Sequence, residues 1–318
     1  MRFCLLLIVF VSFLLAEHDL EHFLRQKNAV LELKAGFINK QDCKDELREQ
    51  FSHKGNEVYI RACDLSKPLL LLLSHVNYGN HLANYLQNDA IMAFVHIKPD
   101  IKAGDLTELI NSLKTRFNKQ KVGLAARALA SIFAQHYAHE YPQNLLFYIG
   151  SSQLVDMRGD ERLFYEAVLN KLAAKKDPEG ELGADYHKLL ELSSYPYIDD
   201  YDKLISTFIY LRKLRANENT CFKHSALWVE QNMKTLAGFL DQYLEFNLDE
   251  DRNYSLPIYY LLSENDCQVL PENAVKYFYR LRAAKKELYL LPSSLDEASS
   301  LPITAGVMRD LIQRSQDE

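Results

Sequence analysis

The sequence contains few residues that break helices. Its 318 residues include only 11 glycines and 9 prolines, and there is a single tryptophan, Trp228. Leu, Ala, Lys and Glu, which favour helices, are common by comparison. The shortage of glycine and proline argues against a collagen-like or low-complexity chain. We therefore predict an all-α fold, a multi-helix bundle of short antiparallel helices joined by short loops.

The sequence also lacks a surplus of basic residues and, beyond its N-terminus, any long apolar run. Lys and Arg number 37 against 43 Asp and Glu, which gives a formal net charge of −6. Proteins that bind nucleic acid usually carry a basic face, so we expect no nucleic-acid partner. A membrane-spanning helix needs about 20 apolar residues, and no later run reaches that length. We therefore expect no membrane span.

The common motifs of nucleotide binding and catalysis are absent as well. The chain has no P-loop, no GxGxxG and no HExxH. It has no Gly-x-Ser-x-Gly turn, since Gly150-Ser151-Ser152 follows an apolar run but lacks the second glycine and a predicted strand. We therefore expect no cofactor, and the lack of a catalytic motif favours a non-enzymatic protein.

The N-terminus has the pattern of a secretory signal peptide. A basic start, Met1-Arg2, precedes the almost continuously apolar stretch Phe3–Leu15, and the small residue Ala16 comes before a charged segment. The apolar stretch is too short to span a membrane. We predict cleavage after Ala16, so that residues 1–16 are removed and the mature protein is secreted.

An even number of cysteines follows the predicted cleavage site. They are Cys43, Cys63, Cys221 and Cys267. In an oxidising compartment this favours two disulfides. The pairing Cys43–Cys63 with Cys221–Cys267 is preferred, because the partners are close in sequence and each pair flanks a predicted turn. A zinc site made of all four cysteines is the less favoured alternative, because no CxxC spacing is present.

The residues 122–141 have the strongest helical pattern in the middle of the chain. Apolar side chains cover one side, and alanines recur every four residues at positions 126, 130, 134 and 138. A helix that is apolar almost all round is usually buried. We predict that Val122–Tyr141 is the central helix of the protein.

Further helices are predicted from apolar periodicity and capping residues. They cover residues 17–39, 42–51, 78–97, 105–117, 160–175, 184–192, 201–216, 225–246, 257–262, 271–286 and 305–313, and Leu69–Leu73 is predicted as the buried first turns of a helix that begins at Pro68. The charged stretch Lys175–Gly183 is the predicted boundary between an N-terminal helical part, 17–176, and a C-terminal part, 184–318. Whether the two parts pack as one domain stays open.

Three groups of polar residues are candidates for function. His136, His139 and Glu140 have the i, i+3, i+4 spacing that could place three ligands around one metal ion. No fourth ligand is evident, so the favoured alternative is a pair of hydrogen-bonded histidines at the end of a buried helix.

The second group lies in a loop that combines aromatic and acidic residues. Tyr197, Asp199, Asp200 and Tyr201 could contact a basic partner, with one of the tyrosines sulfated. The favoured alternative is that Tyr195 and Tyr197 pack inward and that Asp199 or Asp200 caps the next helix. The third candidate is Asn253, which begins the sequon Asn-Tyr-Ser and is a predicted N-glycosylation site.

These observations predict a secreted helical binding protein with no enzymatic activity. Its partner would be an extracellular protein or an apolar small molecule. The alternative is an extracellular hydrolase or a metal-binding protein without a readable motif. The sequence does not set the oligomeric state.

Overall fold

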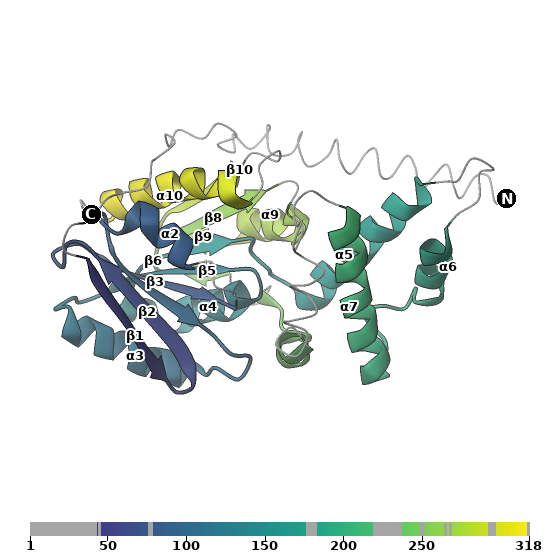
Figure 1. The fold of residues 1–318 in the computed structure, drawn as a ribbon, viewed down its shortest axis with the longest axis horizontal. Coiled ribbons are helices and arrows are strands. Elements are labelled where there is room, and N and C mark those ends of the chain that lie inside the picture. Colours follow the sequence, from purple (N-terminus) through teal and green to yellow (C-terminus); the bar gives the residue numbers. More distant parts are fainter. Residues whose placement is uncertain are drawn as a thin grey trace.

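The centre of the molecule is an eight-stranded sheet, not a helical bundle (Figure 1). The structure is a computed structural model and describes residues 43, 46–75, 79–175, 183–218, 237–248, 252–263, 266, 269–291 and 297–316. The strands lie in the order β1-β2-β4-β3-β5-β6-β8-β10. They are β1 (Leu47–His53), β2 (Asn56–Ala62), β3 (Leu69–Ser74), β4 (Ile91–His96), β5 (Val122–Arg127), β6 (Leu145–Ser151), β8 (Ile258–Ser263) and β10 (Lys286–Leu291). The prediction of an all-α fold is therefore wrong.

Six neighbouring strands of the sheet are parallel, and the first hairpin adds two more at one edge. β2 is antiparallel to both of its neighbours, β1 and β4. The strands from β4 to β10 are parallel to one another. A second, two-stranded sheet pairs β7 (Asn253–Tyr254) with β9 (Arg282–Ala283).

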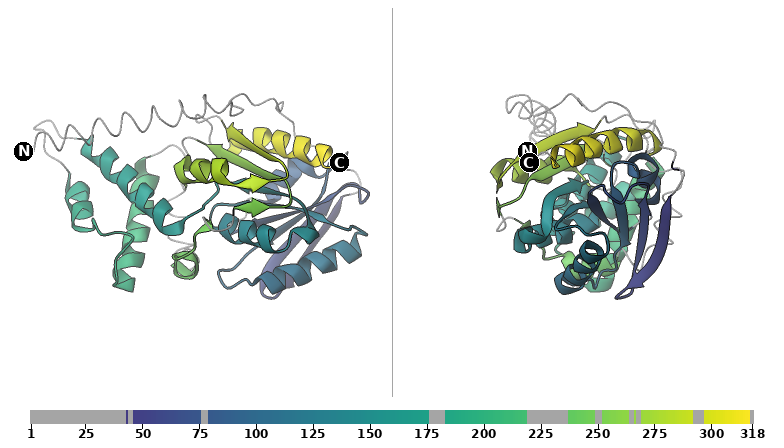
Figure 2. Two further views of the ribbon diagram at one scale, coloured as in Figure 1. Left: turned by 180° about the vertical axis from the view of Figure 1, so that it is seen from behind. Right: turned by 90° about the vertical axis from the view of Figure 1, so that its left-hand side faces the viewer.

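Helices cover both faces of the large sheet (Figure 2). α2 (Gly79–Leu86) and α10 (Glu297–Arg314) contribute to the apolar core on one face. α3 (Ala103–Arg116), α4 (Leu129–Glu140) and α9 (Pro271–Arg280) contribute to the core on the other face. Parallel strands are joined by such crossover helices. Because the helices cover both faces of the sheet, the parallel strands are apolar throughout.

The run Leu69–Leu73 shows why strands were mistaken for helices. Leu69, Leu71 and Leu73 enter the core on one face of β3, and the two leucines between them enter the core on the other. All five side chains are buried. A strand buried on both faces has no alternation of polar and apolar residues, so its periodicity cannot be distinguished from that of a buried helix.

The predicted central helix divides into a strand, a turn and a helix. Val122–Arg127 form β5, and Leu129–Glu140 form α4. The alanines at positions 126, 130, 134 and 138 are all buried, but they belong to two elements that lie on one another. Small residues suit this close strand-to-helix packing as well as they suit packing between helices.

A group of helices extends beyond one end of the sheet (Figure 1). It consists of α5 (Met157–Ala173), α6 (Ala184–Glu191) and α7 (Tyr201–Glu218), which follow β6 in the chain. Here the helix predictions at 160–175, 184–192 and 201–216 agree with the structure. We call α5, α6 and α7 the lid helices.

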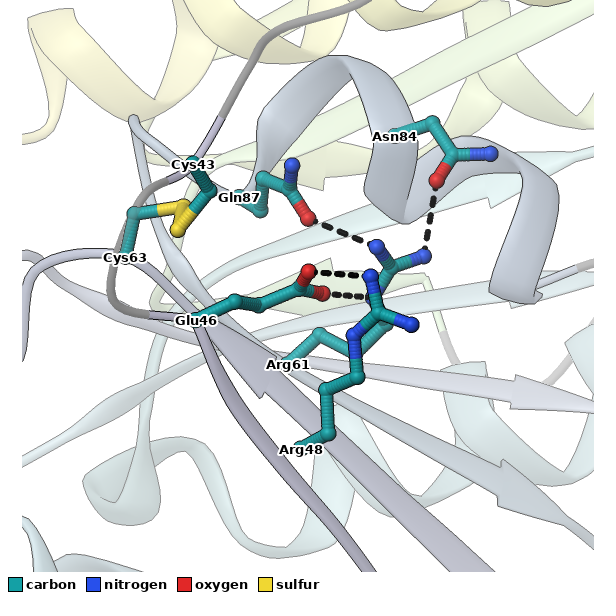
Figure 3. A network of polar contacts seen from close by, with 7 residues as sticks. All are labelled: Cys43, Glu46, Arg48, Arg61, Cys63, Asn84 and Gln87. Carbon is teal, nitrogen blue, oxygen red and sulfur yellow. Dashed lines mark hydrogen bonds and ion pairs between the residues drawn. A yellow bond between two sulfur atoms is a disulfide. The ribbon is translucent and has the colours of Figure 1, made fainter.

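A disulfide fixes the start of the first hairpin (Figure 3). Cys43 and Cys63 are bonded, with their Cα atoms 5.7 Å apart, which is one of the two preferred pairings. Beside it, the Glu46 carboxylate accepts hydrogen bonds from Arg48 and Arg61. Arg61 also donates to the side-chain oxygens of Asn84 and Gln87 of the α2 region, both at 2.8 Å. The disulfide and this polar cluster therefore attach the hairpin to α2.

Several sequence predictions fall outside the described residues. These include Cys221 and Cys267, the predicted signal peptide and the predicted helix at 17–39. The predicted boundary at 175–183 falls mostly outside as well, although the large sheet takes strands from both sides of it.

No helix in the described part of the chain is long and apolar enough to cross a membrane.

Candidate functional site

The parallel strands end together at one edge of the sheet, which we call the carboxyl edge. In open α/β sheets, ligands bind outside the carboxyl ends of the strands, where the strand order reverses. Here that point lies between β3 and β5, because β3 leads to β4 on one side and β4 leads to β5 on the other. His75, Ala128 and Ser152 directly follow β3, β5 and β6. Asp266 lies in the segment after β8.

Ala128 makes a sharp turn between β5 and α4. Its backbone angles are φ 49° and ψ −127°, a region that residues with a Cβ rarely adopt. Its N–H donates to the carbonyl of Ser151 at 3.0 Å. Its carbonyl accepts from the N–H and the hydroxyl of Ser131, at 2.8 and 2.6 Å. Such backbone strain costs about 1–3 kcal/mol and clusters at functional sites.

Ser131 also fixes the neighbouring loop, which follows β6. Its fully buried Oγ accepts a hydrogen bond from the Leu154 N–H at 3.0 Å. The hydroxyl of Tyr148 donates to the Ser131 carbonyl at 3.0 Å and lies 2.7 Å from the side-chain oxygen of Gln153. One serine in the first turn of α4 therefore holds both the Ala128 turn and the loop beside it.

Ser152 and Asp266 form a hydrogen-bonded pair at the same edge. Ser152 has a positive φ of 49°, and its N–H donates to the Leu261 carbonyl at 3.2 Å. Its hydroxyl donates to one carboxylate oxygen of Asp266. The other Asp266 oxygen accepts from the Val269 N–H at 3.0 Å. The loop after β6 and the segment after β8 are thus joined next to Ala128.

His75 directly follows β3 and is buried. Its ring meets the ring of Phe239 edge-on, with the centroids 5.6 Å apart. Burial, aided by the charge of Arg127 and by His96, lowers the pKa of the His75 imidazole to about 3. At neutral pH this ring is therefore uncharged and adds no positive charge to the carboxyl edge.

Asp160, in the first turn of α5, holds the loop between β6 and α5 through its carboxylate. One of its carboxylate oxygens accepts from the N–H groups of Val155 and Asp156, at 3.0 and 3.2 Å. The other accepts from the Asn273 side chain at 3.0 Å. Burial raises the pKa of Asp160 to about 7, although each of these hydrogen bonds favours the ionised form.

Solved structures show which fold this arrangement belongs to. A haloalkane dehalogenase variant from Bradyrhizobium elkanii superposes with a TM-score of 0.54 at 9% identity, over 86% of this chain and 100% of that one. An esterase from Thermogutta terrifontis gives 0.51 at 12% identity, over 85% and 99% of the two chains. MGS-M2, an α/β hydrolase from a Medee basin deep-sea metagenome, gives 0.51 at 12% identity, over 85% and 98%. The chain has the α/β-hydrolase fold. No family model matches the sequence, and no curated protein sequence matches it significantly.

In the α/β-hydrolase fold, the Ala128 turn occupies the place of a conserved strand-to-helix turn. In this fold the nucleophile lies on a strained strand-to-helix turn, the nucleophile elbow, with glycines two residues before and after it. Here the five residues are Ala-Arg-Ala-Leu-Ala, from Ala126 to Ala130. The small outer residues and the backbone turn are kept, but the central side chain is a methyl group. Ala128 therefore cannot act as a nucleophile.

The other positions of an α/β-hydrolase triad are also changed. The acid and the histidine normally follow the nucleophile in that order along the chain. Asp266, after β8, suits the position of the acid. Within residues 1–318, however, no histidine follows His224, so none of these residues after β10 is a histidine. Asp266 instead binds the Ser152 hydroxyl.

The fold overturns the prediction of a non-enzymatic helical binding protein. Similar folds are found in enzymes as different as an esterase and a dehalogenase. The alternative prediction, a hydrolase without a readable motif, therefore agrees better with the structure than the main one.

The predicted metal ligands lie elsewhere and do not converge. His136 is 3.4 Å from Glu140, and its ring packs on Phe246. His139 packs on Tyr254. Across the described ranges, no group of three or more His, Cys, Asp or Glu side chains could hold a metal ion. The structure therefore adds no support for a metal at these residues.

The aromatic and acidic loop lies among the lid helices. Tyr197 and Tyr201 are exposed, at 60% and 48%, and so are Asp199 and Asp200. Asp200 accepts a hydrogen bond from the Lys203 N–H at 3.0 Å and so caps α7. Tyr195 is fully buried, whereas the Tyr197 ring lies under the guanidinium of Arg158. Asn253 is exposed on β7.

Sequence reasoning missed all four residues at the carboxyl edge. A search for Gly-x-Ser-x-Gly cannot find an elbow whose glycines and serine are all alanine. The remaining signal was a small residue at every second position from 126 to 130, directly after an apolar run. Gly150-Ser151-Ser152 lacks the second glycine of the motif, but the strand that was not predicted there is present, since Leu145–Ser151 is β6.

Proposed function

We propose that the carboxyl edge is a hydrolase-type site that receives the carbonyl group of a carboxylic ester. The observation that carries this proposal is the elbow at Ala128, a strained turn at the start of a helix. The first N–H groups of a helix lie outside its internal hydrogen bonds and can bind a developing oxyanion. The Ala128 side chain is a methyl group, which is smaller than the hydroxymethyl group of a serine at the same position.

Cleavage at such a site needs a nucleophile other than residue 128. In hydrolysis the attacking oxygen is supplied by water or by a neighbouring hydroxyl, and the ester is split into an acid and an alcohol. We also propose that residues 1–16 direct secretion, because a disulfide between Cys43 and Cys63 suits an oxidising compartment.

A thiol placed at the elbow tests whether a ligand binds there. Ala128 is only 2% exposed, so reaction of Ala128→Cys with iodoacetamide would itself show that small molecules reach the elbow. We expect this reaction to occur and to be slowed by an alkyl phosphonate that mimics the ester transition state. Ala134→Cys, at a fully buried position further along α4, is the matched control and should remain unreactive. The wild-type protein is then assayed against p-nitrophenyl esters of increasing chain length.

Two results would count against the proposal. If no phosphonate protects the thiol of the Ala128→Cys variant, the elbow is not the binding site. Protection without cleavage of any ester would show a binding site that has no hydrolytic activity.

A further inference from the structure

Two of the backbone outliers lie side by side at the carboxyl edge. Positive φ occurs in the described part of the chain at four non-glycine residues, Lys54, Asn118, Ala128 and Ser152. Lys54 lies in the hairpin turn between β1 and β2, and Asn118 follows the end of α3. The positive φ of these two residues is explained by the turns in which they lie. Ala128 and Ser152 instead follow buried parallel strands, where strain is unusual and indicates function.

The register of the sheet places Ser152 next to the elbow. Arg127 of β5 is paired with Ser151 of β6, so the residues that follow them, Ala128 and Ser152, are neighbours. The hydrogen bond from the Ala128 N–H to the Ser151 carbonyl confirms this. The next strand, β8, leads to Asp266, which binds the Ser152 hydroxyl. The residue next to the turn from which the usual nucleophile is missing therefore carries a hydroxyl that binds a carboxylate.

We propose that Ser152 and Asp266 are the reactive pair of this site, with Ser152 as the nucleophile and Asp266 as its base. This proposal rests on the ester-hydrolase function proposed above. The hydrogen bond between a neutral hydroxyl and a carboxylate is of the stronger, charge-assisted kind and orients the Oγ lone pairs away from Asp266. The Val269 N–H on the second carboxylate oxygen keeps Asp266 in this orientation.

The reaction balances with these two residues and one water molecule. The Ser152 Oγ bonds to the ester carbonyl carbon as its proton passes to Asp266. The carbon–oxygen bond to the alcohol then breaks, and the alcohol leaves with that proton. Water next attacks the ester formed on Ser152 and gives its proton to Asp266, and the Ser152 oxygen leaves and regains it. A carboxylate is a weak base for a hydroxyl, so turnover should be slow compared with that of a triad containing histidine.

Single substitutions distinguish Ser152 from its neighbour. We expect Ser152→Ala to lower the rate of ester cleavage about 100-fold or more, and Asp266→Asn to lower it to a similar extent, since a general base typically contributes about 10²–10⁴-fold. Ser151→Ala is the matched control, because Ser151 is adjacent and equally buried, and its hydrogen bond to the elbow uses the backbone carbonyl, which alanine keeps. The hydroxyl that binds the Asp266 carboxylate belongs to Ser152. The rate of Ser151→Ala should stay within about threefold of the wild-type rate. Circular dichroism and the melting temperature check that each variant is folded.

Trapping the intermediate gives a second, independent measurement. Acid quench during turnover, followed by peptide mapping, should find the acyl group on residue 152. Ser152→Cys should form a longer-lived thioester at the same position.

The outcomes separate this inference from the proposed function. Ester cleavage that is unchanged in Ser152→Ala would overturn the inference and leave the function standing. If the folded wild-type protein binds the phosphonate but cleaves no ester, both the inference and the hydrolytic function fail.

Discussion

At the scale of the residue, the unusual feature is a strained turn without a reactive side chain. Ala128 has the backbone of a nucleophile elbow, and Ser131 and Ser151 hold that backbone with three hydrogen bonds. Each such bond contributes about 1 kcal/mol, which is enough to offset strain of about 1–3 kcal/mol. The turn is therefore stable without any contribution from a hydroxyl at position 128.

Gly150 offers a test of the packing below this site. A Cβ at this position would lie 2.1 Å from the buried side-chain oxygen of Gln153, which Tyr148 also contacts. We expect Gly150→Ala to displace Gln153 and to lower the free energy of unfolding by about 1–3 kcal/mol. Gly104→Ala, in the first turn of α3 with nothing within 4 Å, should instead be neutral or stabilising by up to about 1 kcal/mol. Urea unfolding measures the stability of both variants. An equal change in the free energy of unfolding for Gly150→Ala and Gly104→Ala would contradict the close packing at Gly150.

Asp160 should make stability depend on pH. Its pKa is raised from 3.8 to about 7, so the folded protein binds more protons than the unfolded chain between these values. The stabilisation from this group is therefore complete below pH 3.8 and is lost as the pH rises from there through 7. Asp160→Asn keeps the acceptor for both backbone N–H groups, and its amide can donate to Asn273 once that side chain flips.

We expect the wild-type protein to lose about 3 kcal/mol of stability relative to Asp160→Asn between about pH 4 and pH 8. Guanidinium unfolding of both proteins at the two pH values measures this difference. Because His75 is present in both, its titration cancels. A difference that does not change with pH would show that Asp160 has the same pKa in the folded and the unfolded protein.

At the scale of the element, the lid helices are joined through one buried ion pair. Glu161 of α5 accepts from both terminal nitrogens of Arg212 of α7 and, at 2.5 Å, from the Tyr195 hydroxyl. The Glu161 and Arg212 side chains are only 2% and 16% exposed. The guanidinium lies 4.3 Å from the ring centre of Phe164 and 4.1 Å from that of Phe208.

Replacing one member of this pair should lower the free energy of unfolding much more than replacing both. Glu161→Gln leaves a buried guanidinium without its counter-charge, which typically costs about 3–5 kcal/mol. The double variant Glu161→Gln, Arg212→Met should recover most of that loss. The exposed pair Lys54–Glu108 is the control, since Glu108→Gln should cost less than about 1 kcal/mol. Additive effects in the double variant would argue against a buried pair.

Elements that are amphipathic could be predicted from the sequence, whereas buried ones could not. Four helices with one solvent-exposed face agree with their predicted ranges to within a few residues. They are α3, α5, α6 and α7. β3 and β5 have no solvent-exposed face, so their sequences lack alternation, and helices are predicted there from the sequence. Pairing between strands such as β6 and β8 is a contact between distant parts of the chain, and a single sequence does not show it. The carboxyl edge could not be predicted, because it exists only once the strands are aligned.

At the scale of the whole molecule, the proposed site and the Asn253 sequon lie at opposite ends of the parallel strands. The carboxyl edge holds Ala128, Ser152 and Asp266 and leads into the lid helices. Asn253 on β7 lies just before β8 begins, at the opposite edge. A group attached there would be separated from the proposed site by the length of β8.

This separation predicts a glycan that does not affect binding. With secretion as proposed, Asn253 should carry an N-linked glycan, because its side chain is exposed and the Asn-Tyr-Ser sequon is intact. Enzymatic deglycosylation should increase gel mobility, and Asn253→Gln should abolish the shift. Phosphonate protection of Ala128→Cys should be the same with and without the glycan. A change in protection would show that Asn253 is closer to the site than the sheet indicates.

The elbow also bears on the history of the gene. Alanine and serine codons of the GCN and TCN type differ by a single base, so one point mutation at codon 128 could place a hydroxyl on a turn that is already formed. A histidine after β10 would need a separate change. A single base change therefore separates the present turn from one that carries a serine hydroxyl.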